Sequence, residues 1–281
     1  MAPDLPRVAA LTMVRDEAVF LPIWYRHYRR QVGAPHLYVL DHASRDGSTA
    51  EIPAQVIPLP DGPLDEDLRL FRVTEAVAGL LSCYDWVVHS DVDELVLADP
   101  RHFPTLAHYA ASEPALAARA IGLDLHHLPE EEPPLDPAAP LGGQRRWIRF
   151  SASMCKPALV REIVRWTRGF HASEPEGRFG PLYCVHLRYV DLGLGLDRLA
   201  RTRGRALAPG TEAEHQRVPD REFETLMHNV AELPRHADTP FDPLLPPLNP
   251  WVERVRAGAS LALAGDALWE LPRRFRAALE A

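Results

Sequence analysis

The first ninety residues alternate between short apolar runs and longer segments with helical periodicity. Four apolar runs have the length and composition of buried strands: 7–14, 36–41, 55–59 and 86–90. Apolar residues at helical spacing predict a helix that ends at Gly33, another from about 65 to 82, and a short helix that stops at Pro53. This alternation predicts an α/β fold, a Rossmann-type, mostly parallel sheet flanked by helices.

Polar loops follow the predicted strands at 15–17, 41–48 and 91–94. In a parallel sheet the carboxyl ends of the strands meet at one edge, and binding sites form there. We therefore expect these three loops to lie together and to build the functional site.

After residue 100 strands and helices no longer alternate regularly. The predicted elements are a helix near 103–111, strands at 119–125, 145–154 and 182–190, and a helix at 191–207. The polar, proline-rich segment 126–143 is long for a connection inside a compact domain, so it either covers a substrate or is a solvated acidic excursion. We divide the chain into a catalytic domain, 1–207, and a C-terminal part, 208–281.

The C-terminal part is predicted to be a proline-rich arm followed by a helical extension. Prolines concentrate in 233–250, and two amphipathic helices are predicted at about 251–264 and 266–280. Their apolar positions are Trp251, Val255, Leu261, Trp269, Phe275 and Leu279, and arginines lie beside them. Two interpretations fit this pattern: the helices dock on the catalytic domain, or they lie on an anionic membrane surface.

The composition narrows the class of protein. The formal net charge is −8, which gives no support for a nucleic-acid partner. Cys83, Cys155 and Cys184 are far apart, so the sequence predicts neither a disulfide framework nor a zinc cluster. No apolar stretch approaches the roughly 20 residues that span a bilayer. We expect a cytoplasmic protein, with peripheral contact to the inner face of the membrane through the C-terminal helices as the alternative.

The strongest chemical signal is Asp91-Val92-Asp93-Glu94, which directly follows a buried apolar strand. Carboxylates two residues apart leave the chain on the same side. Hard divalent cations such as Mn²⁺ and Mg²⁺ take one or two carboxylates together with phosphate oxygens, so a DxD at a strand end is suited to a metal–diphosphate ligand. The alternative is a solvated acidic turn.

A single lysine, Lys156, stands among 31 lysines and arginines. Either it survived a bias toward arginine by chance, or its position requires a compact ammonium group.

Three motifs in order, MVRDE (13–17), YVLDHASRDGST (38–49) and VVHSDVDELVL (87–97), resemble the nucleotide-sugar-dependent glycosyltransferases of the GT-A fold. The resemblance is to family 2 and a family 92-like bacterial group in particular. It continues through MCKPALV (154–160), GFH (169–171) and YCVHLRY (183–189), and so covers about residues 7–205.

The resemblance implies a nucleotide-sugar site. It places Arg15, Glu17 and Asp41 near the nucleoside, and Ser44 and Asp46 in the loop that surrounds it.

The same resemblance implies a metal site for Mn²⁺ or Mg²⁺ with Asp91, Asp93 and His186 as ligands. Asp91 and Asp93 would hold the ribose and the metal–diphosphate, and Lys156 would approach the diphosphate or a sugar hydroxyl. Outside the resemblance, a lone strand histidine such as His186 is more often a hydrogen-bonded core residue.

The general base that takes the acceptor proton is not marked by the sequence. His42 replaces the usual Asn or Asp of the family, and the late acidic dipeptide of many inverting relatives is absent. Glu174, His171 and Asp124 are the candidates, because an inverting transfer needs one group to accept the proton of the acceptor hydroxyl.

The sequence therefore predicts a hexosyltransferase. It would move a sugar from a nucleoside diphosphate sugar to a saccharide or other hydroxyl acceptor, with inversion and with a divalent metal. The alternative is a catalytically silent nucleotide-sugar-binding protein of the same fold. A phosphohydrolase with a DxD nucleophile fits less well, because its DxD would stand near the N-terminus and an acidic pair would follow later in the chain.

Overall fold

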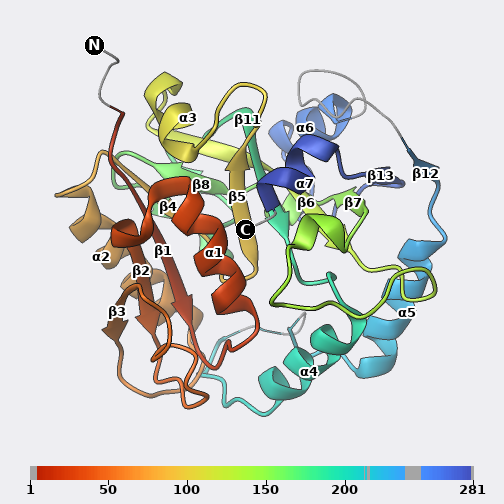
Figure 1. The fold of residues 1–281 in the computed structure, drawn as a ribbon. Helices are drawn as coiled ribbons and strands as arrows, with labels where there is room; N and C mark the ends of the chain where they lie inside the picture. Colours follow the sequence, from red (N-terminus) through yellow and green to blue (C-terminus); the bar gives the residue numbers. More distant parts are fainter. Residues whose placement is uncertain (1–4, 212, 214–215, 238–247, 280–281) are drawn as a thin grey trace.

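The computed structural model describes residues 5–211, 213, 216–237 and 248–279. The N-terminal half contains four parallel strands in the spatial order β3–β2–β1–β4 (Figure 1). Their bounds are Val8–Val14 for β1, Leu37–Asp41 for β2, Gln55–Pro58 for β3 and Trp86–His89 for β4. The short 3₁₀ helix η1 (Ala34–His36) leads into β2.

Helices cover both faces of these strands because successive residues of β1 point to opposite sides. Ala10 packs in one core cluster with Trp24 of α1 (Phe20–Val32), whereas Leu11 packs in another with Val77 of α2 (Glu66–Leu81). The side chain of Asp65 caps α2 by accepting from the backbone N–H groups of residues 67 and 68.

The chain after β4 extends this sheet with strands of mixed direction. β6 (Ala117–His126) lies antiparallel to β7 (Trp147–Phe150) and β8 (Pro157–Val160), and parallel to β11 (Arg178–His186). β11 also pairs antiparallel with β5 (Glu94–Ala98), and β8 joins β4. The other elements of this region are α3 (Leu106–Ser112), η2 (Leu141–Gly143), η3 (Ala152–Met154), β9 (Arg165–Trp166), η4 (Arg168–Phe170) and β10 (Ser173–Glu174).

The C-terminal region wraps around the mixed half of the sheet (Figure 1). Its elements are α4 (Leu192–Arg203), α5 (Asp220–Ala231), β12 (Arg235–His236), α6 (Asn249–Arg256), β13 (Leu268–Glu270) and α7 (Arg273–Leu279). β13 pairs antiparallel with β7 and parallel with β12. Val252 of α6 and Phe275 of α7 are buried in the same core cluster as residues of β1 and β6.

The predicted α/β architecture, a largely parallel sheet flanked by helices with C-terminal helices added, is confirmed. Three local predictions are wrong. Residues 48–50 before Pro53 form turns rather than a helix, and the predicted helix 251–264 ends at Arg256. Leu268–Glu270 is a strand, because it finds a pairing partner in β7, and only Arg273–Leu279 of the predicted helix 266–280 is helical.

The C-terminal apolar positions are mostly buried in the protein itself. Val255, Trp269, Phe275 and Leu279 are buried and Trp251 is half-buried, whereas Leu261 is 48% exposed. Most of the predicted proline-rich arm, 238–247, lies outside the described residues, and the division at residue 207 stays a prediction. Within the described residues, no helix combines the length and apolar character needed to cross a membrane.

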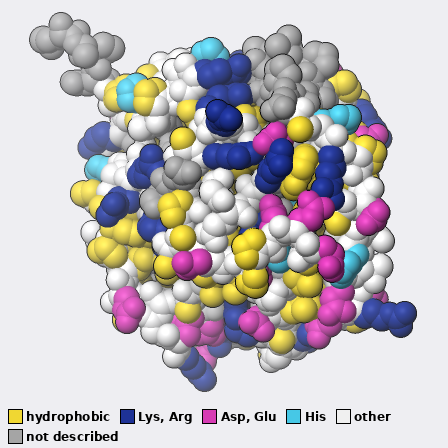
Figure 2. Space-filling view, turned by 45° about the vertical axis from the view of Figure 1, so that its right-hand side comes forward, with side chains coloured by type: hydrophobic (Ala, Val, Ile, Leu, Met, Phe, Trp, Pro, Cys, Tyr) yellow, Lys and Arg dark blue, Asp and Glu magenta, His cyan; other side chains and the backbone are white. Residues whose placement is uncertain are grey.

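Charged side chains of both signs are spread over the face in Figure 2, with apolar side chains between them. The surface charges on this face therefore do not by themselves mark one binding site.

Candidate active site

The loops after β1 and β2 are bound to each other, as their place at one sheet edge predicts. The backbone N–H of Asp16 donates to Ser44 Oγ (3.0 Å), and the N–H of Ala18 donates to Asp46 Oδ2 (3.0 Å). Asp41 Oδ1 accepts from the backbone N–H of Ser44 (2.9 Å). These polar side chains hold the shape of the loops by accepting hydrogen bonds from backbone N–H groups.

Backbone strain is concentrated around the same edge. Within the described residues, the non-glycine positions with positive φ are Asp16 (56°), Ala43 (56°) and Phe170 (60°). Asp16 and Ala43 lie in the two loops just described, and the Phe170 ring lies 5.0 Å from the guanidinium carbon of Arg69. Such conformations cost of order 1–3 kcal/mol each and gather at functional sites.

Asp91 and Asp93 lie at the carboxyl end of β4, and each carboxylate is contacted by two cationic groups. Asp91 accepts from Arg69 of α2 and from Lys156 Nζ (3.3 Å). Asp93 accepts from Arg198 of α4, and its Oδ2 lies 3.4 Å from His186 Nε2.

The neighbouring cations keep both aspartates ionised. Burial, the largest single effect, would raise the pKa of each carboxyl group, but Arg69 and Lys156 with His89 together outweigh it at Asp91, and Arg198 and His186 together outweigh it at Asp93. The pKa of both groups is therefore well below its ordinary value.

Lys156 is buried between two carboxylates. Its Nζ lies 2.5 Å from Glu94 Oε1 in addition to its contact with Asp91. Burial disfavours the charged ammonium, yet Glu94 and Asp91 outweigh this and raise the pKa of Lys156 above its ordinary value. The compact ammonium fits here because the space between the carboxylates is narrow.

His186 of β11 connects Asp93 to Asp124 of β6. Its Nδ1 lies 2.7 Å from Asp124 Oδ1, so the N–H at this position donates to Asp124 and Nε2 faces Asp93. Burial lowers the pKa of His186, but the two aspartates outweigh burial and raise it to about 9. Asp124 thus fixes the orientation of the imidazole ring.

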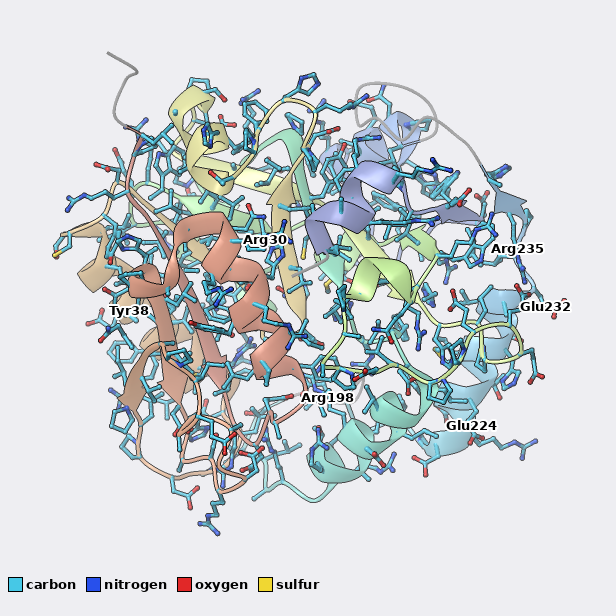
Figure 3. All side chains as sticks on the ribbon, viewed as in Figure 1. Arg30, Tyr38, Arg198, Glu224, Glu232 and Arg235 are labelled. Carbon is cyan, nitrogen blue, oxygen red and sulfur yellow. The ribbon has the colours of Figure 1, made fainter. Side chains whose placement is uncertain are left out.

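Arg198 links Glu17, in the loop after β1, to Asp93, after β4. Its Nη2 and Nε donate to Glu17 Oε1 (2.9 and 3.2 Å), while Nη1 donates to Asp93. Figure 3 shows Arg198 between α4 and the start of α1, and its guanidinium carbon lies 4.9 Å from the Phe20 ring centroid. Burial raises the pKa of Glu17, and its Oε2 has no hydrogen-bond partner within the described residues.

We call these nine residues the charged cluster: Glu17, Arg69, Asp91, Asp93, Glu94, Asp124, Lys156, His186 and Arg198. A register row runs through part of it. Glu94 is paired with His186, His186 with Asp124, and Asp124 with Arg149, on the neighbouring strands β5, β11, β6 and β7. Directly paired residues project on the same face of a sheet, so these four side chains form one line across it.

The donor chemistry of the cluster fits a divalent cation held partly by substrate. Asp93 and the Nε2 of His186 are neighbouring ligands of the kinds that Mn²⁺ accepts, and Asp124 supplies the carboxylate that commonly supports a ligating histidine. The described residues contain no group of three or more His, Cys, Asp or Glu positioned for a metal ion.

Two parts of the predicted site remain: Arg15 in the loop after β1, and the base candidates Glu174 and His171. Arg15 Nη2 pairs with Asp61 (2.8 Å), and Arg15 Nη1 donates to the carbonyl of Gly62 (2.9 Å), which ties the first loop to the segment before α2. The base candidates do not come together. Glu174 is three-quarters exposed and pairs with Arg165, and His171 Nδ1 donates to the Ser153 carbonyl (2.8 Å).

Sequence reasoning missed Arg69, Arg198 and Glu94. Two of them are arginines on helices in a chain that has 30 arginines, so residue type alone did not distinguish them. Glu94 stands directly after the DxD in the sequence. The side of the sheet on which its side chain lies, and so its contact with Lys156, depends on where β5 begins.

No family model and no curated protein matches this chain. The solved structures that match it include three of low similarity. A mannosyltransferase from Pyrobaculum calidifontis in complex with GDP-Man and Mn²⁺ has 16% identity and a TM-score of 0.28, over 44% of this chain and 36% of that one. A cytidylyltransferase from Leptospira borgpetersenii has 12% identity and a TM-score of 0.27, over 44% and 55%.

The third is a mannose-1-phosphate geranyltransferase from Thermus thermophilus, with 12% identity and a TM-score of 0.29 over 95% of this chain and 74% of that one. This chain therefore spans about a third to three quarters of the length of these proteins. Similarities at this level do not assign an activity, and the charged cluster is the basis for a proposed function.

Proposed function

We propose that the protein is a glycosyltransferase that moves a sugar from a nucleoside diphosphate sugar to a hydroxyl acceptor. One observation carries the proposal: the acidic pair Asp91 and Asp93, at the carboxyl end of β4, is contacted by cations from separate elements. Arg69 comes from α2, Lys156 from the segment before β8, and Arg198 from α4.

Interleaved charges of both signs suit a ligand that itself carries both signs. Buried carboxylates alone favour a metal ion, and arginines and lysines alone favour a phosphate group. A metal–diphosphate complex presents a cation to the aspartates and anionic oxygens to the arginines. A cation at Asp93 would weaken the attraction between that carboxylate and Arg198, so Arg198 would be able to pair with the diphosphate.

Each part of the site has a role in this proposal. Asp93 and His186 Nε2 would hold the cation, with the Nε2 proton released to solvent on binding, and the cation would neutralise charge on the leaving diphosphate. Asp91 and Lys156 would bind the ribose and the diphosphate. Two strained loops would enclose the nucleoside, one with Arg15 and Glu17 after β1 and the other with Ser44 and Asp46 after Asp41, the last residue of β2.

The chemical step is a displacement at the anomeric carbon, and we expect inversion. The acceptor oxygen forms a bond to that carbon, the bond from the carbon to the diphosphate oxygen breaks, and the diphosphate leaves with the electron pair. A base takes the acceptor proton. Asp124 is a positioning residue for His186, because its carboxylate already accepts from that ring, and so Glu174 and His171 are the base candidates.

A nucleotide-sugar-binding protein without turnover is the second candidate. This candidate is favoured because each of the five carboxylates of the charged cluster is already paired with an arginine, with Lys156 or with His186. Release of nucleoside diphosphate separates the two candidates, because a silent binder takes up the nucleotide with Mn²⁺ and releases nothing.

The test is a thermal-shift panel of nucleoside diphosphates and their sugars, with and without Mn²⁺. A ligand at 100 times its dissociation constant stabilises a protein by about 2.7 kcal/mol. We expect Mn²⁺-dependent stabilisation by one nucleotide, loss of it in Asp93→Asn, and no change in the control Asp197→Asn. Asp197 is exposed on α4 next to Arg198. Equal nucleotide and Mn²⁺ binding by Asp93→Asn and the wild type would contradict the proposal.

A further inference from the structure

A pocket of about 450 Å³ lies between α5 and β7, outside the charged cluster. Its wall includes the apolar side chains of Leu226, Val230 and Leu233 together with Thr225 and Asn229 of α5. Arg149 of β7, and Arg221 and Glu222 at the start of α5, add charge to it. Pockets of this size and mixed character are typical of small-molecule sites.

Arg149 is the half-buried charge of this pocket. Its Nε donates to the Gly265 carbonyl (2.6 Å), which fixes the plane of the guanidinium group. Within the described residues, neither terminal nitrogen of Arg149 has a hydrogen bond. An arginine held in this way presents two parallel N–H donors, a geometry that matches a carboxylate or a phosphate.

The pocket is connected to the charged cluster by the register row. Arg149 is paired with Asp124, and Asp124 holds His186, which faces Asp93. The pocket therefore lies one strand away from the Asp124–His186 pair, on the same face of the sheet. A molecule anchored at Arg149 would therefore be separated by one strand, β6, from the His186 side chain that faces Asp93.

We propose that this pocket binds the acceptor, and that the acceptor is an anionic amphiphile whose charged group pairs with Arg149 while its apolar part lies against Leu226, Val230 and Leu233. The assignment as acceptor site rests on the proposed function. The net charge of the lining supports it, because Arg149 and Arg221 outweigh Glu222. The lining includes no residue of the two nucleotide loops, so the pocket is not needed for donor binding.

The test is calorimetric titration of the full chain with four probes: octyl phosphate, octanoate, inorganic phosphate and octyl glucoside. We expect the two anionic amphiphiles to bind at least tenfold more tightly than neutral octyl glucoside and than inorganic phosphate. The better of the two anionic probes identifies the head group. Equal binding of all four probes, or binding of none, overturns the proposal.

Two variants place this binding in the pocket. Arg149→Met should reduce the affinity for the anionic amphiphile at least tenfold, and Arg254→Met, an exposed arginine on α6, should leave it unchanged. Because Arg149→Met also loses the bond to Gly265, a second variant avoids the sheet. Leu226→Glu adds a negative charge at a position that is 38% exposed, and we expect it to abolish binding of the anionic probes.

Leu261→Glu, at a leucine that is 48% exposed outside the pocket lining, is the matched control and should bind like the wild type. Unchanged binding in both Arg149→Met and Leu226→Glu overturns the site. The two proposals fail separately. Nucleotide binding without binding of an anionic amphiphile overturns this inference alone, whereas amphiphile binding without any nucleotide binding overturns the role of the pocket as acceptor site together with the proposed function.

Discussion

The ammonium group of Lys156 lies 2.5 Å from Oε1 of Glu94, and both side chains are almost fully buried. The same ammonium group reaches Asp91 at 3.3 Å. One small cation therefore pairs with both Asp91 and Glu94, the first residue of β5. This is the position at which an arginine-rich chain retains its single lysine, and the bulkier guanidinium fork would need a wider space than two carboxylates at these distances leave.

Lys156→Met should destabilise the protein by about 3–5 kcal/mol, because it leaves Glu94 as a buried charge without its partner. Urea unfolding measures this cost. The double variant Lys156→Met/Glu94→Gln removes both charges, and we expect its cost to be well below the sum of the two single costs. Additive costs would show that the two side chains do not interact in solution.

Arg198→Ala should lower the free energy of unfolding by about 3 kcal/mol. The substitution leaves Glu17 and Asp93 without their shared cation, and the value is at the lower end of the range for buried pairs because 26% of the Arg198 side chain is exposed. Arg201→Ala on the same helix changes an exposed residue, and we expect an effect within about 0.5 kcal/mol. A cost for Arg198→Ala no greater than that for Arg201→Ala would remove Arg198 from the cluster.

The stability of the protein should fall between pH 6.5 and pH 4 in part because of His27. Burial lowers its pKa from 6.5 to about 4. The unfolded chain then binds a proton that the folded chain does not, so the stabilisation is complete above pH 6.5 and is lost as the pH falls toward 4. The loss from this group reaches about 3 kcal/mol at pH 4.

His27→Gln keeps a side-chain donor for the Val96 carbonyl, which His27 Nε2 contacts at 2.9 Å, but it does not titrate. Melting temperatures measured across this pH range should therefore decline less steeply for the variant than for the wild type. His89 and His126, whose pKa values burial lowers to about 3 and about 4, still contribute a decline of the same sign in both proteins. Identical pH profiles would contradict the contribution of His27.

Gly122→Ala should destabilise the protein by at least about 3 kcal/mol, the upper part of the range for overpacking. A Cβ atom at this position of β6 would lie 2.2 Å from the carbonyl oxygen of Ser151 and 2.5 Å from the carbonyl carbon of Met154, and backbone atoms have no low-cost way to move aside. Gly79→Ala in α2 is the matched control. It meets nothing within 4 Å, and alanine should add about 0.5–1 kcal/mol of helix stability. Chemical denaturation of both variants measures the contrast.

The sequence determined the local elements that have a strong period or a long apolar run. β1, β2 and β4 are apolar runs of strand length, and α1 and α2 have helical spacing, so the N-terminal half was predictable. Leu268–Glu270 was not, because three residues become a strand only when β7 offers a free edge. The helix α5 was overlooked, although Phe223, Met227 and Val230 recur at helical spacing and are buried on one face.

The sequence also determined that Asp91 and Asp93 follow a buried strand, and that Lys156 is unusual among so many arginines. Only the tertiary structure decided which groups neutralise these carboxylates. Arg69 and Arg198 are separated from the aspartates by 22 and 105 residues and come from helices on different parts of the chain. Their roles depend on distance in space, because the sequence does not show which arginines the fold places next to a buried carboxylate.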